Sequence, residues 1–477
     1  MIRIEGAKKR YADCVAVAEG SLEARAGSIH ALVGENGAGK STLLGIIAGT
    51  VHADAGRLTV DDRELPLARH DPRAALAAGI GLVHQHFRLV HSLTVAENVI
   101  LGNEPRRGLL IDRERAVREI RELSERAGLA VDPTALVESL PVGARQRVEI
   151  LKVLWRGARV LLLDEPTAVL SPPEVAGLLE VLGKLRDEGR TIVLVTHKLR
   201  EVAAAADEVT VMRQGAVVAR KQKPLDEAEL ARAIVGGAEV PRIERGAHEL
   251  GEVRLAVEAV AVGDALGGVS FEVRAGEILG IAGVMGNGQS ELVLALTGLA
   301  EYRGRIRREG ALAHMPEDRH ARGAVLDMSV AENFVLGRQR ELPGWGFAPA
   351  GLAERARPAL GEWGVVPPDP GMRFGALSGG NQQKVVAARE LGRQEVGVVI
   401  AAEPTRGVDL LASAHIHAAL IAAAKAGAAV VLVSSDLAEL RALSDRLIVM
   451  YRGRIAGELA TSEATDEQLG RLMTGGA

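Results

Sequence analysis

The stretch Gly34–Thr42 reads GENGAGKST and follows the apolar run SIHALV, residues 28–33. Strand, glycine-rich loop, Lys-Ser pair and helix in this order are the pattern of a phosphate loop. The glycines let backbone N–H groups turn toward a phosphate at the positive end of the next helix. A glycine-rich surface loop is the alternative, and the complete order disfavours it. We therefore expect the phosphates of a nucleotide to be held by Gly34, Asn36, Gly37, Gly39, Lys40, Ser41 and Thr42.

Two carboxylates end a second apolar run, VLLLDEPT, residues 160–167. Asp164 is suited to binding Mg²⁺ through water, beside the hydroxyl of Ser41. Glu165 is suited to orienting and deprotonating an attacking water. An Asp-Glu pair at a strand end is usually a solvated loop, but its place downstream of a phosphate loop favours hydrolysis.

The chain repeats itself once at domain length. DEVTVMRQGAVVA from Asp207 realigns with DRLIVMYRGRIAG from Asp445, and other segments match in the same order. We predict domains at 1–238 and 254–477, joined by a polar linker at 239–253. In each copy apolar runs alternate with helical stretches, which indicates a largely parallel α/β sheet. The charged periodic segment at 113–129 predicts an inserted helical subdomain.

Composition narrows the function classes. A net charge of -4 disfavours a nucleic-acid surface. Cys14 is the only cysteine, so an internal disulfide or a metal–thiolate cluster is excluded. The N-terminus lacks the apolar core of a signal peptide, and the apolar run at 418–433 contains Lys425 and predicts a helix, a turn and a strand. The expected protein is soluble and cytoplasmic, with peripheral membrane contact.

The order of phosphate loop, glutamine loop, signature segment, DEPT segment and switch histidine resembles ATP-binding-cassette (ABC) ATPases, and it occurs twice. The resemblance implies two tandem P-loop NTPase domains of the α/β class. Each would have a RecA-like core, a helical subdomain and an N-terminal antiparallel β region. It implies ATP and Mg²⁺ as cofactors, with Gln85 linking the metal and water shell to a transport partner. It also implies that His197 contacts the γ-phosphate and that Tyr11 stacks on adenine. Taken alone, Gln85 and His197 would be a surface amide and a strand-end histidine.

The second copy departs from this pattern at the catalytic positions. Gln289 stands for Lys40, Ala402 for Asp164, Ser435 for His197, Val260 for Tyr11 and Glu317 for Gln85, while Gly283, Gly286, Gly288, Ser290 and Glu403 are retained. In the signature motif, by contrast, the first copy is the altered one. The second copy has LSGGNQQK at 377–384, whereas the first has LPVGARQR at 140–147. Pro141 offers neither a hydroxyl nor an N–H, although proline is acceptable at a helix start.

ABC domains pair head to tail, as the resemblance implies, so each ATP lies between one phosphate loop and the opposite signature. One composite site would then join the intact first-copy residues to Ser378, Gly379, Gly380, Asn381 and the loop at Asp409. The other would join Gln289, Ser290, Ala402, Glu403 and Ser435 to Pro141. We predict hydrolysis at the first site and not at the second; slow turnover sustained by Glu403 alone is the alternative.

Fused ATPase halves of this kind resemble the importer subunits for simple sugars and nucleosides. The runs VHQHFRLVHSLTVAENVILG at 83–102 and GVMGNGQSEL at 283–292 look most like the nucleoside branch, which is associated with basic-membrane-protein-type lipoproteins. A departure is Glu403, where this branch leads us to expect glutamine. A ribose- or galactose-type import ATPase is the alternative cargo assignment.

The resemblance implies two transmembrane permease subunits and a lipid-anchored or periplasmic substrate-binding protein. The chain would lie at the cytoplasmic face of the cell membrane. Permease contacts are expected at 84–94 and 317–329, and their difference suggests two non-identical permeases. A translation-factor ABC protein is disfavoured by the short linker, the degraded second site and the negative charge. DNA-repair ABC ATPases would bring zinc cysteines or long coiled coils, and Glu165 with His197 argues against a module without turnover.

Overall fold

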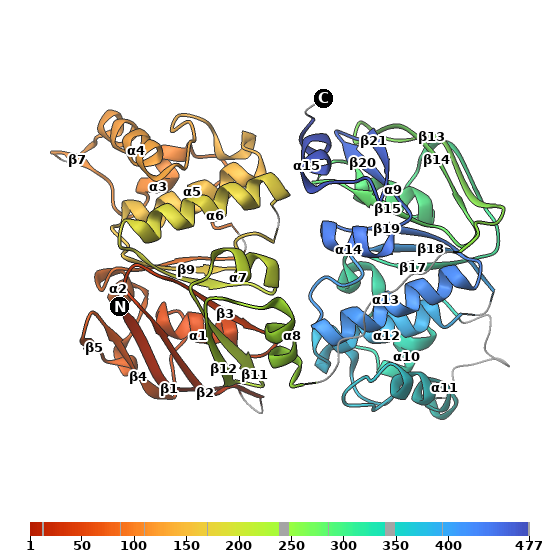
Figure 1. Cartoon of the computed structure of the whole chain (residues 1–477), viewed down its shortest axis with the longest axis horizontal. Helices are drawn as coiled ribbons and strands as arrows, with labels where there is room; N and C mark the ends of the chain where they lie inside the picture. Colours follow the sequence, from red (N-terminus) through yellow and green to blue (C-terminus); the bar gives the residue numbers. More distant parts are fainter. Residues whose placement is uncertain are drawn as a thin grey trace. The chain divides into compact units, whose positions relative to one another are not determined.

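The computed structural model describes residues 1–11, 14–85, 87–108, 110–168, 170–237, 248–284, 286–338, 349–393 and 395–475. The chain divides into two compact units, Met1–Glu239 and Val240–Ala477 (Figure 1). Most of the predicted linker, residues 239–247, lies outside the described residues, so its limits stay a prediction. Each unit is an α/β domain, and the predicted class of two tandem P-loop domains is confirmed.

Unit 1 is built on one ten-stranded sheet in the order β5-β4-β1-β2-β12-β11-β3-β10-β9-β6. The parallel strands are β3 (Ile29–Gly34), β6 (Ile80–Val83), β9 (Val160–Asp164), β10 (Thr191–Val195) and β11 (Glu208–Arg213). The strands with antiparallel partners are β1 (Ile2–Tyr11), β2 (Cys14–Ala24), β4 (Ala55–Val60), β5 (Arg63–Leu65) and β12 (Ala216–Gln222). The two regions are joined by the pairing of Ala216 with Glu19.

The central strands are mostly apolar because helices cover both faces of the sheet. All five residues of β10 are buried. The covering helices are α1 (Lys40–Ile47), α2 (Pro72–Ala77), α6 (Pro172–Asp187), α7 (Leu199–Ala205) and α8 (Glu227–Val235). Leu43 and Ile46 of α1 pack with Leu32, Leu162 and Val193 of the sheet in one core cluster. This packing fixes α1 directly after the carboxyl end of β3, where the phosphate loop lies.

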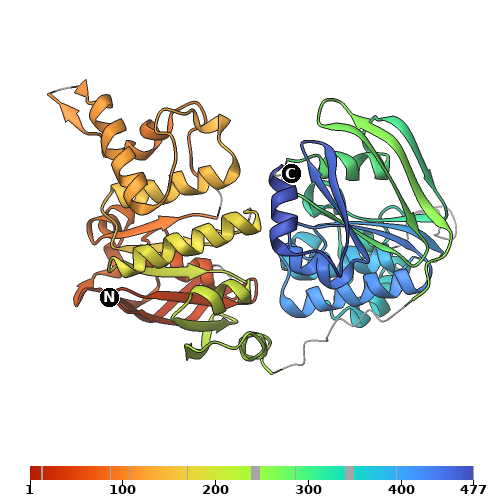
Figure 2. The same cartoon turned by 45° about the horizontal axis from the view of Figure 1, so that its top comes forward.

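The predicted helical subdomain of unit 1 is present. It contains α3 (Val95–Ile100), α4 (Arg113–Ala127), α5 (Val142–Trp155) and the hairpin of β7 (Arg106–Arg107) and β8 (Leu110–Ile111). Helix α4 buries Ala116, Ile120 and Leu123 and exposes its charged side chains, as its periodicity predicts. Figures 1 and 2 show the hairpin at the outer end of this subdomain, beyond α4.

Unit 2 divides the same kinds of strand between two sheets. A six-stranded sheet has the order β17-β18-β19-β15-β20-β21, and a three-stranded antiparallel sheet has the order β14-β13-β16. Their bounds are β13 (Val253–Val262), β14 (Leu266–Arg274), β15 (Ile278–Ala282), β16 (Arg303–Arg308), β17 (Ala311–Met315), β18 (Val396–Ala402), β19 (Ala429–Val433), β20 (Arg446–Tyr451) and β21 (Arg454–Ala460).

The helices of unit 2 follow the order of unit 1. They are α9 (Gln289–Thr297), α10 (Val330–Val335), α11 (Pro349–Glu362), α12 (Gly379–Leu391), α13 (Leu410–Lys425), α14 (Leu437–Leu443) and α15 (Asp466–Thr474). A single π-helical turn, η3 (Arg319–Gly323), follows β17. The run around Lys425 is α13, a turn and β19, as predicted. Within the described ranges, no helix is both long and apolar enough to cross a membrane.

Candidate functional site

The phosphate loop of unit 1 has a shape that only glycine permits at two of its positions. Gly34 has φ +155°, and a Cβ there would collide with the carbonyl oxygen of Met212. Gly39 caps α1 with φ +95°, and its Cβ would collide with the carbonyl oxygen of Ala16. The loop thus passes against two neighbouring strands and delivers Lys40 at the first turn of α1.

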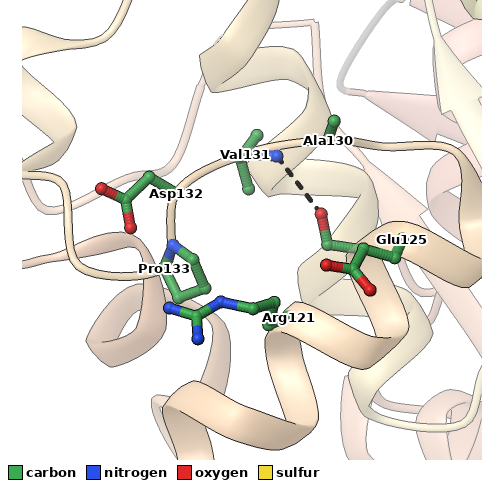
Figure 3. A pocket seen from close by; sticks show the side chains of 7 residues that line it. Arg121, Glu125, Ala130, Val131, Asp132 and Pro133 are labelled. Atoms are coloured by element: carbon green, nitrogen blue, oxygen red, sulfur yellow. Dashed lines mark hydrogen bonds between the residues drawn. The ribbon is translucent and has the colours of Figure 1, made fainter.

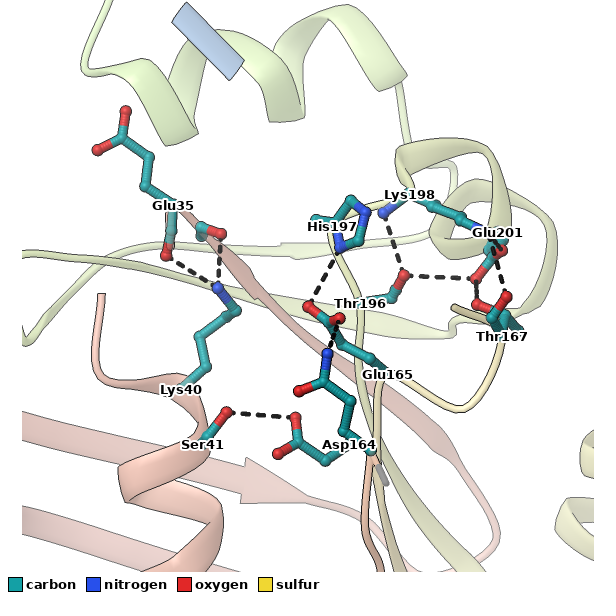
Figure 4. Close-up of polar contacts among 12 residues, drawn as sticks. Glu35, Lys40, Ser41, Asp164, Glu165, Thr167, Thr196, His197, Lys198 and Glu201 are labelled. Atoms are coloured by element: carbon teal, nitrogen blue, oxygen red, sulfur yellow. Dashed lines mark hydrogen bonds and ion pairs between the residues drawn. The ribbon is translucent and has the colours of Figure 1, made fainter. Parts of the chain in front are cut away.

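Lys40 is buried and turned back into its own loop. Its Nζ donates to the carbonyl oxygens of Gly34 at 2.8 Å and Glu35 at 2.9 Å (Figure 4). Burial lowers the pKa of Lys40, and the carboxylates of Glu165 and Asp164 oppose that shift. The ammonium group is therefore held by carbonyl dipoles that phosphate oxygens could replace. Of the other predicted phosphate contacts, Asn36 is exposed in the loop and Thr42 is half-buried in α1.

Ser41 and Asp164 lie together at the ends of α1 and β9. The Ser41 hydroxyl donates to Asp164 Oδ1 at 3.3 Å. Burial raises the pKa of Asp164, and the hydrogen bond from Ser41 acts in the opposite direction. A hydroxyl beside a carboxylate offers the oxygen ligands that Mg²⁺ prefers.

Glu165 is the point where three distant segments converge. Gln85 Nε2 donates to Glu165 Oε2 at 2.8 Å, and His197 Nδ1 lies 3.1 Å from Glu165 Oε1. Burial alone would raise the pKa of Glu165, but the hydrogen bond with His197 and the charges of His197 and Lys40 outweigh it, so the pKa is lowered. The structure thus brings the predicted base together with the predicted glutamine and switch histidine, and it keeps the base ionised.

A layer behind this cluster was not predicted from the sequence. The buried carboxylate of Glu201 accepts from the hydroxyls of Thr167 at 2.7 Å and Thr196 at 3.3 Å, and Lys198 Nζ donates to the Thr167 carbonyl at 3.2 Å. Figure 4 shows this layer joining the DEPT segment to the His197 segment. The repeat could have indicated this layer, because Glu439 and Thr405 of unit 2 align with Glu201 and Thr167. In the structure Glu439 accepts from the Thr405 hydroxyl in the same way, at 2.7 Å.

The two predicted adenine positions have opposite surroundings. Tyr11 ends β1 with 47% of its surface exposed, and Lys9 Nζ lies 5.4 Å from its ring centroid. Val260, its counterpart in β13, is fully buried in the core of unit 2. An aromatic face is therefore accessible in unit 1, while the assignment of Tyr11 to adenine stays a prediction.

The phosphate loop of unit 2 keeps the left-handed conformation of two of its glycines and loses the cation. Gly286 and Gly288 have φ +90° and +98°. Gln289 Nε2 donates to the Val284 carbonyl at 3.2 Å, so an amide takes the place of the Lys40 ammonium. The hydroxyl of Ser290 is bound by Glu317 at 2.8 Å. The side chains of Gln289 and Ser290 are therefore both hydrogen-bonded within unit 2, the first to a neutral carbonyl oxygen and the second to a carboxylate.

The counterpart of the catalytic base is also altered. Ala402, at the position of Asp164, is buried and apolar. Glu403 accepts from the Ser435 N–H at 2.7 Å and from its hydroxyl at 3.1 Å. Burial and the nearby Glu439 raise the pKa of Glu403 to about 7, against the hydrogen bonds from Ser435. Glu403 is therefore only partly ionised at neutral pH, unlike Glu165, and the apolar Ala402 stands where Asp164 does.

The signature segments begin their helices differently. In unit 2 the exposed hydroxyl of Ser378 caps α12 and accepts from Asn381 Nδ2 at 2.9 Å, and Asp409 lies beside Gly380. In unit 1 Pro141 precedes α5 without any side-chain cap. There a Cβ on Gly143 would collide with the Glu174 carboxylate, so an acidic group lies against the helix start.

A cavity of about 470 Å³ lies elsewhere, at the end of α4 (Figure 3). Its lining consists of Arg121, Ser124, Glu125, Ala130, Val131, Asp132 and Pro133. The Val131 N–H donates to the Ser124 hydroxyl at 3.2 Å. None of the predicted nucleotide residues lines it, so this cavity is separate from the Lys40–Glu165 cluster.

Comparison with known proteins identifies the family. The ABC transporter family matches residues 17–168 and 266–406. The nucleoside import ATP-binding protein NupA of Lactococcus lactis subsp. cremoris is 41% identical, covering 100% of this chain and 98% of that protein. The guanosine import ATP-binding protein NupO of Bacillus subtilis is 40% identical, with 100% and 97% covered. The ribose import ATP-binding protein RbsA 1 of Streptomyces avermitilis is 41% identical, with 98% and 92% covered.

Among solved structures, RNase-L Inhibitor aligns with a TM-score of 0.68 at 19% identity, covering 98% of this chain and 93% of that one. This likeness concerns the fold alone. The family match to both halves and the full-length relatives agree with the phosphate loop, the DEPT segment and the signature described above. The chain therefore belongs to the ABC transporter family, whose ATP-binding domain it contains twice.

Proposed function

We propose that the chain is the ATP-hydrolysing subunit of an ABC importer that takes up nucleosides. The observation that carries this proposal is the convergence of Gln85 and His197 on an ionised Glu165 beside Lys40. The nucleoside cargo is supported by the full-length similarity to NupA and NupO. Ribose import is the second candidate, since RbsA 1 of S. avermitilis is equally similar.

The chemistry of unit 1 follows from its contacts. When ATP binds, Lys40 exchanges its two carbonyl partners for oxygens of the β- and γ-phosphates. Ser41 and Asp164 would hold Mg²⁺, which supplies neutralisation of the phosphate charge when bound. Glu165 accepts a proton from the attacking water, and Gln85 and His197 orient its two carboxylate oxygens.

Only the phosphate loop of unit 1 hydrolyses ATP in this proposal, with the signature at 378–381 of unit 2 completing the site. Removing a single preorganised charge-stabilising group costs ~10²–10³ in rate. The second combination lacks the cation at Gln289, the carboxylate at Ala402 and the histidine at Ser435. Because these three groups are missing together, we expect negligible turnover there.

The partners in this proposal are two non-identical transmembrane permeases and a lipid-anchored or periplasmic substrate-binding protein. The permease contacts would be 84–94 in unit 1 and 317–329 in unit 2, of which His86 lies outside the described residues. Val90 is exposed in the first segment, and Val325, Leu326 and Met328 are exposed in the second. Exposed apolar side chains at both places support docking there. The chain would then lie at the cytoplasmic face of the cell membrane.

The test uses the chain assembled with its permeases and binding protein in vesicles. ATPase activity should rise with nucleosides and not with ribose; stimulation by ribose alone would contradict the nucleoside assignment. Lys40→Ala should abolish the stimulated activity, whereas the matched change Gln289→Ala should leave it within about twofold. Substantial activity in Lys40→Ala would contradict the asymmetric model.

A further inference from the structure

An arginine of unit 2 lies at the start of the signature helix. Arg319 opens the π-helical turn η3, which directly follows the segment of Glu317. Its Nε donates to Gln382 Oε1 at 3.3 Å, and its Nη1 donates to the Arg406 carbonyl oxygen at 3.3 Å. His320 Nε2 contacts the same Gln382 oxygen at 2.8 Å. The turn is thus fastened to α12 by its first two side chains.

The guanidinium group of Arg319 lies directly on the signature glycine. A Cβ on Gly379 would come within 2.6 Å of Arg319 Nη2, and one on Gly407 would lie 3.7 Å from Nη1. The bare backbone of Gly379 therefore makes the room that Arg319 occupies. In unit 1 the aligned residue is Val142, whose side chain would fill that room.

The placement is electrostatically unusual. Within the described part of the chain, no carboxylate is ion-paired with Arg319, and it donates to two neutral oxygens, Gln382 Oε1 and the Arg406 carbonyl oxygen. Neighbouring Asp318 is engaged instead in capping the turn, accepting from the His320 and Ala321 N–H groups. Burial lowers the pKa of Arg319, Asp318 opposes that shift, and the charge of Arg406 adds to it. A half-buried cation beside a helix N-terminus is unfavourable unless an anion binds there.

The neighbouring charged side chains are bound to other groups and do not pair with Arg319. Arg406, the second cation, already pairs with Glu317 at 3.5 Å. Asp409 caps α13 through the Ala412 N–H at 2.7 Å and lies beside Gly380. Arg319 thus makes no ion pair within the described residues, although the charge of Asp318 acts on it from nearby, and it lies next to the exposed Ser378 hydroxyl.

We propose that Arg319 is a further catalytic residue, which contacts the γ-phosphate of the ATP that the intact signature receives. This inference rests on the proposed pairing of the unit 1 phosphate loop with the unit 2 signature. Arg319 adds a planar, permanently charged donor to the Ser378 hydroxyl and the backbone N–H groups of α12. An arginine in such a position stabilises the negative charge on a transferring phosphoryl group.

Unit 1 supplies the internal comparison. Its altered signature has Val142 in place of Gly379 and the Glu174 carboxylate against Gly143. It also has an arginine at the helix start, Arg145, which donates to the carbonyl oxygens of Leu140 at 3.0 Å and Glu138 at 2.9 Å. Arg145 therefore has the same kind of backbone contacts as Arg319 and serves as the matched control.

The experiment measures ATP and ADP affinities of the transporter complex in a Glu165→Gln background, which prevents turnover. Arg319→Ala should weaken ATP binding by about 10- to 100-fold, the loss of one charge-assisted hydrogen bond, while ADP binding stays unchanged. Arg145→Ala should change neither. Equal changes in ATP and ADP affinity, or no change, would overturn the inference.

A second variant separates charge from architecture. Arg319→Gln keeps a donor for Gln382 and the Arg406 carbonyl but removes the charge, so it should lose ATPase activity like Arg319→Ala, by ~10²-fold. Activity at the wild-type level in Arg319→Gln would show a positioning role and overturn the proposal. Loss of activity in Lys40→Ala with no effect at Arg319 would refute this inference and leave the proposed function standing. Retention of activity in Lys40→Ala would refute the proposed function instead.

Discussion

Replacing Glu403 by glutamine is expected to stabilise the protein above pH 7. The pKa of this carboxyl is about 7 in the folded protein, against an ordinary value of 4.5. Between those values the folded chain holds a proton that the unfolded chain has released, so stability falls as pH rises through this window. Each unit of difference corresponds to about 1.4 kcal/mol, which gives a penalty of about 3 kcal/mol above pH 7. Glutamine is neutral at every pH and escapes it.

The substitution should keep the local hydrogen bonds. The Ser435 N–H can donate to the glutamine oxygen, and the glutamine amide can donate to the Ser435 hydroxyl, in place of the two bonds of Glu403. The expected gain is therefore close to the full penalty at pH 8 and less than about 1 kcal/mol at pH 5. For a unit of this size a gain of about 3 kcal/mol raises the melting temperature by roughly 6–12 °C.

Differential scanning calorimetry of the full chain at pH 5 and pH 8 measures this effect. The matched control is Glu165→Gln, because the lowered pKa of Glu165 stabilises the fold above its ordinary pKa and loses that contribution as pH falls. Glu165→Gln should therefore destabilise at pH 8, the opposite sign. A gain for Glu403→Gln that is the same at both pH values, or a loss at pH 8, would refute the reasoning. ATPase activity should survive Glu403→Gln.

Three further predictions concern unit 1. Gly34→Ala should lower the free energy of unfolding by about 3 kcal/mol or more, because the new Cβ collides with a backbone carbonyl. Gly37→Ala has open space around it and should lower the free energy of unfolding by only about 1–2 kcal/mol; urea denaturation of both variants measures the difference. Thr167→Val should cost about 1–3 kcal/mol because the buried Glu201 carboxylate loses its shortest hydrogen bond, and Thr405→Val, which removes the equivalent bond of Glu439, should cost a similar amount; no loss in either variant would contradict this. Asp164→Asn should raise the Mg²⁺ concentration for half-maximal ATPase about tenfold or more, and an unchanged Mg²⁺ titration would exclude a metal role.

Local sequence determined much of the fold. The apolar runs that end at Gly34 and Asp164 are buried strands, as their continuous apolar pattern predicts. Helix α4 was predictable because Ala116, Ile120 and Leu123 recur at helical spacing among charged residues. The repeat then transferred these assignments to unit 2.

Contacts between segments were not predictable in the same way. The sequence shows that a carboxylate is retained at Glu403, but it does not show that burial and the nearby Glu439 raise its pKa to about 7. Arg319 lies in a turn with no counterpart in unit 1, so the repeat gave no information about where its guanidinium group packs. Likewise, nothing in the strand pattern distinguishes the continuous sheet of unit 1, joined through Ala216 and Glu19, from the two separate sheets of unit 2.

Lys40 and Gln289 each donate hydrogen bonds within their own phosphate loop, and this has an evolutionary consequence. Lys40 satisfies two loop carbonyls and Gln289 satisfies one, so both loops are stable without a ligand. In the proposed mechanism, a lysine-to-glutamine change at this position removes the charge that binds the phosphates and keeps a hydrogen-bond donor to the loop. A duplicated domain could therefore lose its chemistry in a single step without passing through an unfolded ancestor. Its helices and signature would remain available for selection on what they contribute to the other domain.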